Sequence, residues 1–350
     1  MGQETKKYDA WLHWSLTDKC NLRCNYCIAG SPSKKNAGLS EINIPALLGT
    51  LKRTNKIFRI GLTGGGEPFL VPNFVEACEA ITERHYILLL TNLTSSRVKE
   101  FAKRINPERV LQITASTHIE ELERCKLTDV YVAHFLLLKE RGFDVRAREV
   151  AHPLLSAEAG HYKQFFKLRG IDLEFEPFLG EFRGEKYPAS YSERELKIFD
   201  FRESKKSILE RYCQYGKVCN AGYNTGVVDP EGNISSCYLI KDKIGNIYNN
   251  ILFREERVVC PFKICYCPLN EFDPYLFKKS MEECGPSARR AGFFVLRHLL
   301  VDKINKIAGI LGIFLRVFYP RGYINSRNFY DKLCHQWRSR RKSFCGNSHL

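Results

Sequence analysis

The 350-residue sequence lacks the features that mark secreted and membrane-spanning proteins. Residues 1–9 are polar and no apolar run follows them, so no secretory signal peptide is expected. In the C-terminal region the uninterrupted apolar part, residues 307–315, is too short to cross a bilayer. Without a signal peptide, the fourteen cysteines are better explained as metal ligands and reduced thiols than as disulfides. The sequence therefore predicts a cytoplasmic protein.

Acidic residues are scarce in the C-terminal region. The whole chain has a net charge of +15, and residues 286–350 hold thirteen Lys and Arg against two Asp. Residues 293–318 also have apolar side chains at helical spacing, which predicts a basic amphipathic helical tail. Such a tail can pack on the rest of the protein, lie on an anionic membrane surface, or bind nucleic acid. All three roles stay open, with nucleic acid the least favoured.

A fourth cysteine is missing from the cluster of cysteines near the amino terminus. Cys20, Cys24 and Cys27 have the spacing C-x3-C-x2-C, and the next cysteine is Cys78. Iron–sulfur clusters are ordinarily closed by four cysteines. Three thiolates can hold a four-iron cluster and leave one iron open for a reacting ligand, as a catalytic zinc keeps one position open. The alternative is a structural zinc site or unrelated thiols.

With aromatic Tyr26 before the last cysteine, this segment resembles the signature of radical S-adenosylmethionine (SAM) enzymes. The resemblance implies that the open iron of a [4Fe–4S] cluster binds SAM. An electron from the cluster then cleaves SAM, and the 5′-deoxyadenosyl radical abstracts a hydrogen atom from the substrate. It also implies an electron donor such as flavodoxin or ferredoxin. The protein itself supplies orientation and exclusion of water.

Short apolar runs alternate with segments of helical spacing up to about residue 180. This alternation predicts an α/β fold with a parallel sheet and right-handed crossovers. Six units are fewer than the eight of a closed barrel, so a partial (β/α)6 TIM-like barrel is expected, which also resembles the radical SAM core. The expected strands are 11–16, 57–62, 86–90, 110–114, 143–150 and 171–178, and the expected helices include 74–84, 98–105, 130–141 and 158–168.

Polar residues follow the expected strands at their carboxyl ends, where parallel α/β folds place their sites. The second strand runs into Gly65, Gly66, Glu67 and Pro68, which resemble the GGEP motif that binds the methionine amino group of SAM. Glycines let backbone approach a ligand closely. Further SAM contacts that the resemblance implies are Ser116, Arg148, Asn92 for the pocket wall, and Tyr26 beside the adenine. Each of these four also has an alternative. Ser116 could be a capping hydroxyl and Arg148 an exposed charge. Asn92 could be a turn-forming residue and Tyr26 an ordinary loop aromatic.

Cysteines return after residue 212. Between Cys219 and Cys237 the residues Asp229 to Gly232 predict a hairpin turn. The cysteine and glycine spacing resembles the start of the SPASM and twitch extensions of radical SAM enzymes, which bind auxiliary [4Fe–4S] clusters. Tyr238 stands where some SPASM enzymes have an acidic catalytic base. One auxiliary cluster is expected, with a zinc knuckle as the alternative, and its candidate ligands are Cys213, Cys219, Cys237, Cys260, Cys265 and Cys267.

The sequence therefore predicts a barrel over 8–212, a cysteine-rich extension over 213–285 and the tail over 286–350. The expected activity is hydrogen abstraction from a sugar, a peptide or another small molecule. One of four residues near strand ends is expected to handle the substrate proton. An RNA-modifying radical SAM enzyme and a non-catalytic zinc protein that binds nucleic acid are the alternatives. The four candidate residues are Glu174, Glu176, His118 and His152.

Overall fold

A computed structural model of the chain describes residues 8–27, 40–63, 65–201, 215–216, 218–240 and 242–262. The chain divides into two compact units, residues 1–293 and 294–350, and all the described residues belong to the first. The expected tail lies outside the described residues, as do Cys213, Cys265 and Cys267.

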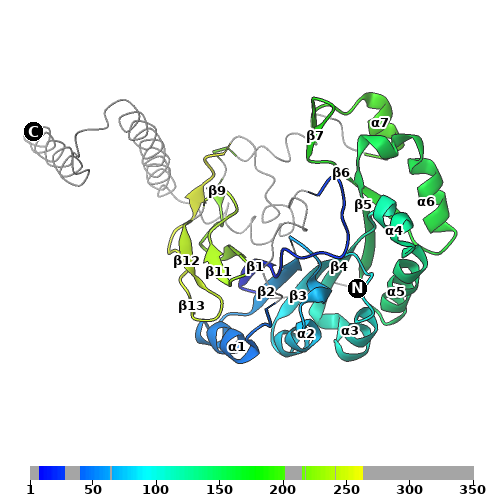
Figure 1. Cartoon of the computed structure of the whole chain (residues 1–350). Coiled ribbons are helices and arrows are strands. Elements are labelled where there is room, and N and C mark those ends of the chain that lie inside the picture. The colour runs from blue at the N-terminus through cyan, green and yellow to red at the C-terminus, as the bar shows by residue number, and fades with distance from the viewer. Residues whose placement is uncertain are drawn as a thin grey trace, which may run out of the picture. The chain divides into compact units, whose positions relative to one another are not determined.

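Six parallel strands form the centre of the fold, in the order of the chain (Figure 1). Each strand is hydrogen-bonded in parallel to the next, which confirms the partial barrel predicted from the alternation of strands and helices. The strands are β1 (Ala10–Ser15), β2 (Phe58–Thr63), β3 (Tyr86–Thr91), β4 (Val110–Ser116), β5 (Val145–Ala151) and β6 (Leu173–Pro177).

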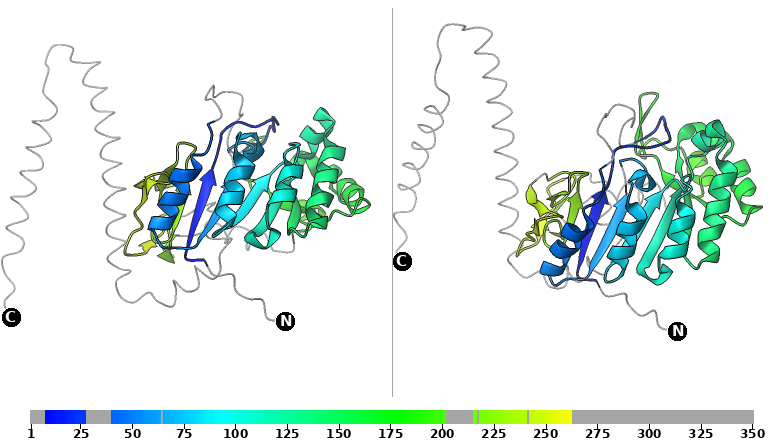
Figure 2. Two further views of the ribbon diagram at one scale, coloured as in Figure 1. Left: turned by 90° about the horizontal axis from the view of Figure 1, so that it is seen from below. Right: turned by 60° about the horizontal axis from the view of Figure 1, so that its bottom comes forward.

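Helices connect these strands and cover the outer face of the curved sheet (Figures 1 and 2). The α-helices are α1 (Ile44–Arg53), α2 (Phe74–Thr82), α3 (Val98–Arg104), α4 (Ile119–Cys125), α5 (Thr128–Glu140), α6 (Ala159–Lys167) and α7 (Glu193–Ile198). The four expected helices correspond to α2, α3, α5 and α6. Short 3-10 helices are η2 (Pro68–Leu70), η3 (Pro107–Arg109) and η4 (Pro153–Ala157). Every helix in the described ranges is too short or too polar for a bilayer crossing.

The cysteine-rich region extends the same sheet. Strand β10 (Thr225–Val228) pairs in parallel with β1, and β11 (Asn233–Ser235) pairs with β10 in the predicted hairpin. Ten of the described strands thus form one continuous sheet that also includes β12 (Lys243–Asn246) and β13 (Asn250–Ile251). Two separate pairs are β7 (Gly180–Phe182) with β8 (Glu185–Tyr187), and β9 (Val218–Cys219) with β14 (Val258–Val259).

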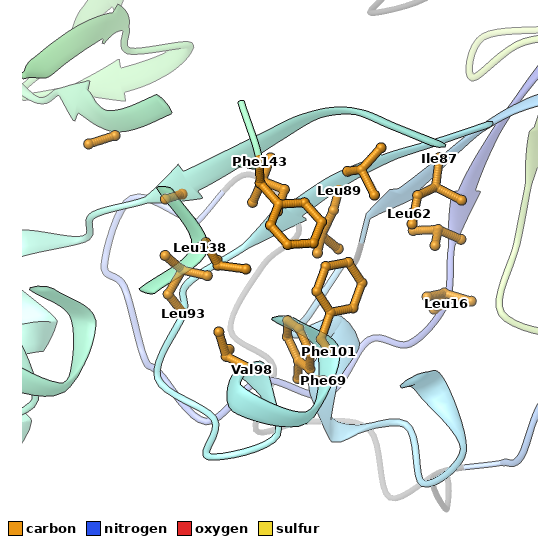
Figure 3. Close-up of a cluster of buried hydrophobic side chains, with 14 of the residues drawn as sticks. Leu16, Leu62, Phe69, Ile87, Leu89, Leu93, Val98, Phe101, Leu138 and Phe143 are labelled. Carbon is orange, nitrogen blue, oxygen red and sulfur yellow. The ribbon is translucent and has the colours of Figure 1, made fainter. Parts of the chain in front are cut away.

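The hydrophobic core lies between the sheet and the helices. Alternate strand residues face the helices, so Leu12 and Trp14 of β1 are buried there. Phe69 and Phe101 meet with ring centroids 5.7 Å apart, and Phe143 lies 5.6 Å from Phe101 (Figure 3). This packing fixes the strands and so holds the loops at their carboxyl ends in a defined arrangement.

Candidate active site

The first cysteine group occupies the loop that follows β1, here called the cysteine loop (residues 16–27). Cys20, Cys24 and Cys27 are all half-buried and unoxidised. The backbone N–H of Leu22 donates to the Cys20 sulfur over 3.4 Å, and the Asn92 amide donates to it over 3.9 Å. The sulfur of Cys20 is therefore already a hydrogen-bond acceptor, as cluster ligands commonly are.

The electrostatics of the cysteine loop favour a cationic ligand. Burial, together with the charges of Glu67 and Cys27, raises the pKa of Cys20 to about 11. Burial also raises the pKa of Cys24 well above its usual range, and the other thiols and two carboxylates act in the same direction. Thiolates in this setting need positive charge beside them, which an iron cluster would supply. No three His, Cys, Asp or Glu side chains in the described ranges converge on a single metal ion. Three thiols from one loop are the donor set of a [4Fe–4S] cluster with one open iron.

The motif that follows β2 is bonded directly to the cysteine loop. The N–H of Gly66 donates to the Thr17 carbonyl over 2.8 Å, and the N–H of Glu67 donates to the Lys19 carbonyl over 2.8 Å. A Cβ on Gly66 would lie 1.8 Å from the Lys19 oxygen. Only glycine permits so close an approach of two backbones. Gly65 precedes this contact, and Pro68 begins η2 immediately after it.

The Glu67 carboxyl is buried and joins the ends of β2 and β3. It accepts hydrogen bonds from the Phe69 N–H (3.1 Å), the Thr91 hydroxyl (2.7 Å) and the Asn92 N–H (2.8 Å). Burial outweighs these donors and raises its pKa to about 7. The structure therefore gives Glu67 a positioning role beneath the cysteine loop. Its predicted contact with the SAM amino group stays a prediction.

Asn92 forms a turn and also contacts the cysteine loop, and its predicted place in the wall of the SAM pocket stays a prediction. Its side-chain oxygen accepts from the Thr94 N–H over 3.1 Å, as a turn-forming Asn does. Its amide donates to the Asn21 side chain over 2.9 Å, which connects the end of β3 to the cysteine loop. Asn21 also donates to the Thr94 hydroxyl over 2.7 Å.

Tyr26, His118 and His152 form an aromatic group at the ends of β4 and β5. The Tyr26 hydroxyl lies 3.1 Å from the His118 Nδ1, and the His152 ring stacks on Tyr26 with centroids 5.7 Å apart. Burial lowers the pKa of His118 to about 4. Both histidines contact a residue of the cysteine loop, so they are better suited to holding that loop than to accepting a proton from substrate.

A buried glutamate that the sequence interpretation missed also belongs to this group. Glu149 of β5 accepts from the Tyr26 hydroxyl over 3.0 Å. In β5 it lies on the same face as Ala147 and Ala151, which are buried in the core. A carboxylate in the buried register of a strand is a signal that the period of two could have revealed.

Arg148, Glu174 and Glu176 form an ionic cluster on the opposite face of β5 and β6, away from the helices. Arg148 pairs with Glu176, and its Nε lies 3.6 Å from a Glu174 oxygen. The Arg148 side chain is mostly buried, whereas both glutamates are about half exposed. Ser116 of β4 is beside Arg148 in the sheet register. These four predicted site residues thus lie on neighbouring strands, but Arg148 is already neutralised by two carboxylates.

The second cysteine group lies near the hairpin. Strand β14 pairs with β9 so that Val258 is opposite Cys219, and Cys260 follows two residues later. Burial raises the pKa of Cys237, and the charge of Cys260 adds to this effect. The Tyr238 hydroxyl lies against Nδ1 of His13, a buried residue of β1 that the sequence interpretation did not include. Three of the six predicted auxiliary ligands are described, and the other three lie outside the described residues.

The fold and the cysteine loop together define a partial barrel with a three-thiol site at the carboxyl ends of its strands. Residues 14–146 match the family model of the radical SAM superfamily. This part of the chain matches a radical SAM domain, and its similarity to the family supports an enzyme of the radical SAM type. Members of that family use a [4Fe–4S] cluster and SAM, the chemistry that the donor set fits.

Curated relatives match parts of the chain. Mycofactocin maturase MftC of Mycobacterium ulcerans (strain Agy99) is 31% identical over 110 residues, 31% of this chain and 27% of the relative. GTP 3′,8-cyclase of Aquifex aeolicus (strain VF5) is 29% identical over 181 residues, 47% of this chain and 55% of the relative. The match thus spans about a quarter of the first relative's length.

Solved structures share the fold. Histidine-tagged anSMEcpe with bound AdoMet has a TM-score of 0.52 and 19% identity, over 68% of this chain and 74% of that one. Native anSMEcpe with bound AdoMet has a TM-score of 0.50 and 21% identity, over 68% and 78%. The likeness supports the partial barrel.

Proposed function

We propose that this chain holds a [4Fe–4S] cluster through Cys20, Cys24 and Cys27 and abstracts a hydrogen atom from a peptide or small-molecule substrate. The observation that carries the proposal is the cysteine loop itself, bonded to Gly66 and Glu67 by backbone and to the end of β3 through Asn21. The bound cluster and SAM supply the one-electron chemistry. The chain supplies a fixed loop at the strand ends.

The roles of the individual side chains follow from where they lie. The three thiols hold the cluster, and Glu67 and Asn92 fix the loop against β3. Ser116 is suited to a polar group of SAM because it ends β4 and lies beside Arg148 in the sheet register. The half-exposed Glu174 and Glu176 are the better candidates for contact with substrate, because the histidines are engaged by Tyr26.

The substrate class is proposed from the relatives and from the ionic cluster. One matched relative is named a maturase and another a GTP cyclase, so both peptide and nucleotide-like substrates fit this family. The cluster of Arg148, Glu174 and Glu176 carries one positive against two negative charges, which favours a substrate with a cationic or hydroxyl group. An electron donor such as flavodoxin or ferredoxin would supply the reducing electron.

We further propose one auxiliary [4Fe–4S] cluster in a SPASM- or twitch-like extension. The β9–β14 pair sets Cys219 opposite Val258, two residues before Cys260, and the charge of Cys260 acts on buried Cys237. Cys213, Cys265 and Cys267 are the further candidates for its ligands.

Anaerobic purification and reconstitution test the proposal. We expect iron and labile sulfide at the stoichiometry of at least one four-iron cluster, and release of 5′-deoxyadenosine from SAM after reduction with dithionite. Serine at Cys20, Cys24 or Cys27 should abolish this release. The control is Cys78→Ser, because Cys78 is buried in α2 within the core. A colourless protein that contains only zinc would refute the proposal.

A further inference from the structure

Glu149 is a buried carboxylate whose two oxygens meet three protein donors. Oε1 accepts from the Tyr26 hydroxyl over 3.0 Å and from the Val150 N–H over 2.9 Å. Oε2 accepts from the Ile119 N–H over 2.8 Å. The residue is 1% exposed. A carboxylate buried among donors is costly to replace, because each donor would be left without an acceptor.

Two of the three donors belong to other parts of the active-site rim, and the third, Val150, is the next residue of β5. Tyr26 is in the cysteine loop, next to Cys27, whereas Ile119 is the first residue of α4. Glu149 itself is near the end of β5. One side chain thus fixes the cysteine loop to two neighbouring strand–helix connections.

The start of α4 makes its own contacts with the cysteine loop. The Arg23 N–H donates to the Glu121 carboxylate over 2.6 Å. His118, which precedes α4, has the left-handed φ of 44° that non-glycine residues seldom adopt, and its ring contacts the Tyr26 hydroxyl. Such a conformation persists where the surroundings determine it strongly. The bond from Ile119 to Glu149 holds the residue that follows this turn.

We propose that Glu149 is a positioning residue of the radical SAM reaction, which holds Tyr26 and thereby sets the cysteine loop relative to the end of β4. The inference rests on the proposed function, because it assigns Glu149 a task in presenting the cluster and SAM. The hydrogen bond that joins Glu149 to the cysteine loop is the one from Tyr26. The ring of Tyr26 is fixed by Glu149, by His118 and by the stacked His152.

The test uses SAM binding by the reconstituted full-length chain, measured by equilibrium dialysis. Glu149→Gln keeps the size of the side chain but replaces one accepting oxygen with an amide NH2 group, which cannot accept the hydrogen bonds that Glu149 accepts. Tyr26→Phe keeps the ring and removes only the hydroxyl. We expect each variant to raise the Kd for SAM about tenfold or more, the factor that corresponds to about 1.4 kcal/mol. The double variant should bind SAM no more weakly than the weaker-binding single variant, because both changes break the same hydrogen bond between Tyr26 and Glu149.

A spectroscopic readout separates positioning from general stability. Iron and sulfide contents of both single variants should stay near those of the wild type, while the change that SAM produces in the EPR spectrum of the reduced cluster should be diminished. The control is Asp229→Asn, which alters a carboxylate that accepts a backbone N–H over 2.8 Å in the hairpin turn. It should leave SAM binding and the EPR change unaltered.

The outcomes distinguish this inference from the proposed function. If the wild-type chain binds no SAM, the proposed function fails. If the wild-type chain binds SAM and Glu149→Gln binds it equally well, only the role of Glu149 is refuted. Additive losses in the double variant would also refute it, since Glu149 would then not act through Tyr26. Should Glu149→Gln fail to fold, Tyr26→Phe decides alone, and normal SAM binding by that variant would overturn the proposal.

Discussion

Alanine at Gly66 should detach the cysteine loop from the strand beneath it. The added methyl would lie 1.8 Å from the Lys19 oxygen and 2.2 Å from its carbonyl carbon, both of them backbone atoms that cannot rotate away. The loop must therefore move, and the bonds from Gly66 to Thr17 and from Glu67 to Lys19 would be lost.

The magnitude follows from these two effects. Overpacking costs about 1–3 kcal/mol, and each lost hydrogen bond costs roughly 1 kcal/mol. We expect Gly66→Ala to lower the free energy of unfolding by about 3–5 kcal/mol in total. The displaced loop should also hold less iron after reconstitution, because its thiols would no longer be fixed relative to one another.

Urea unfolding of anaerobic protein, together with iron analysis, measures both effects. The matched control is Gly160→Ala in α6, where an added Cβ has nothing within 4 Å. That change should raise the free energy of unfolding by about 0.5–1 kcal/mol, because alanine is the better helix former. If Gly66→Ala had the unfolding midpoint and iron content of the wild type, the inferred contact between motif and cysteine loop would be wrong.

Three further predictions concern other parts of the molecule. Alanine variants of Glu174, Glu176, His118 and His152 should separate into two kinds. Loss of the glutamate that handles the substrate proton should reduce product turnover by about a hundredfold or more, the usual scale for such a group. Loss of either histidine should instead weaken SAM binding. Full turnover by all four variants would exclude them. His85 accepts the Phe58 N–H over 3.2 Å, and burial lowers its pKa to about 4. The unfolded chain therefore binds more protons between pH 6.5 and 4, so the contribution of neutral His85 to the free energy of unfolding should fall by at most about 3 kcal/mol as the pH falls through that window. A flatter pH dependence of unfolding in His85→Gln would verify this. Replacing Arg254 with Gln should lower the free energy of unfolding by about 1 kcal/mol in thermal melts, because the ion pair with Asp242 is only partly buried; an unchanged melt would contradict this.

The sequence predicted the six strands and the long helices because each has a clear apolar period. It predicted the cysteine loop and the glycine motif because their spacing is specific. Helix α1 was missed, although Asn43 caps it through the Ala46 N–H. The short α4 has too few turns for its period to be recognised.

The connections between distant residues could not be read from the sequence. Glu149 and Tyr26 are separated by 123 positions, and His13 and Tyr238 by 225. Such pairs depend on strand register and on which strands are neighbours. For the same reason the sequence did not reveal that the register of β5 and β6 places Arg148 beside Glu174 and Glu176. Its contact with SAM stays a prediction.

The parallel pairing of β1 with β10 has a consequence for the architecture of the enzyme. Trp11 and His13 are partnered by Thr225 and Val227, so the strand that leads into the cysteine loop obtains half of its ladder from a segment more than 200 positions later. A truncated chain ending before residue 218 would leave β1 with a bare, apolar edge, which promotes aggregation. The barrel and the distal cysteine segment therefore share one sheet, and removal of the distal segment exposes the strand that leads into the thiol site.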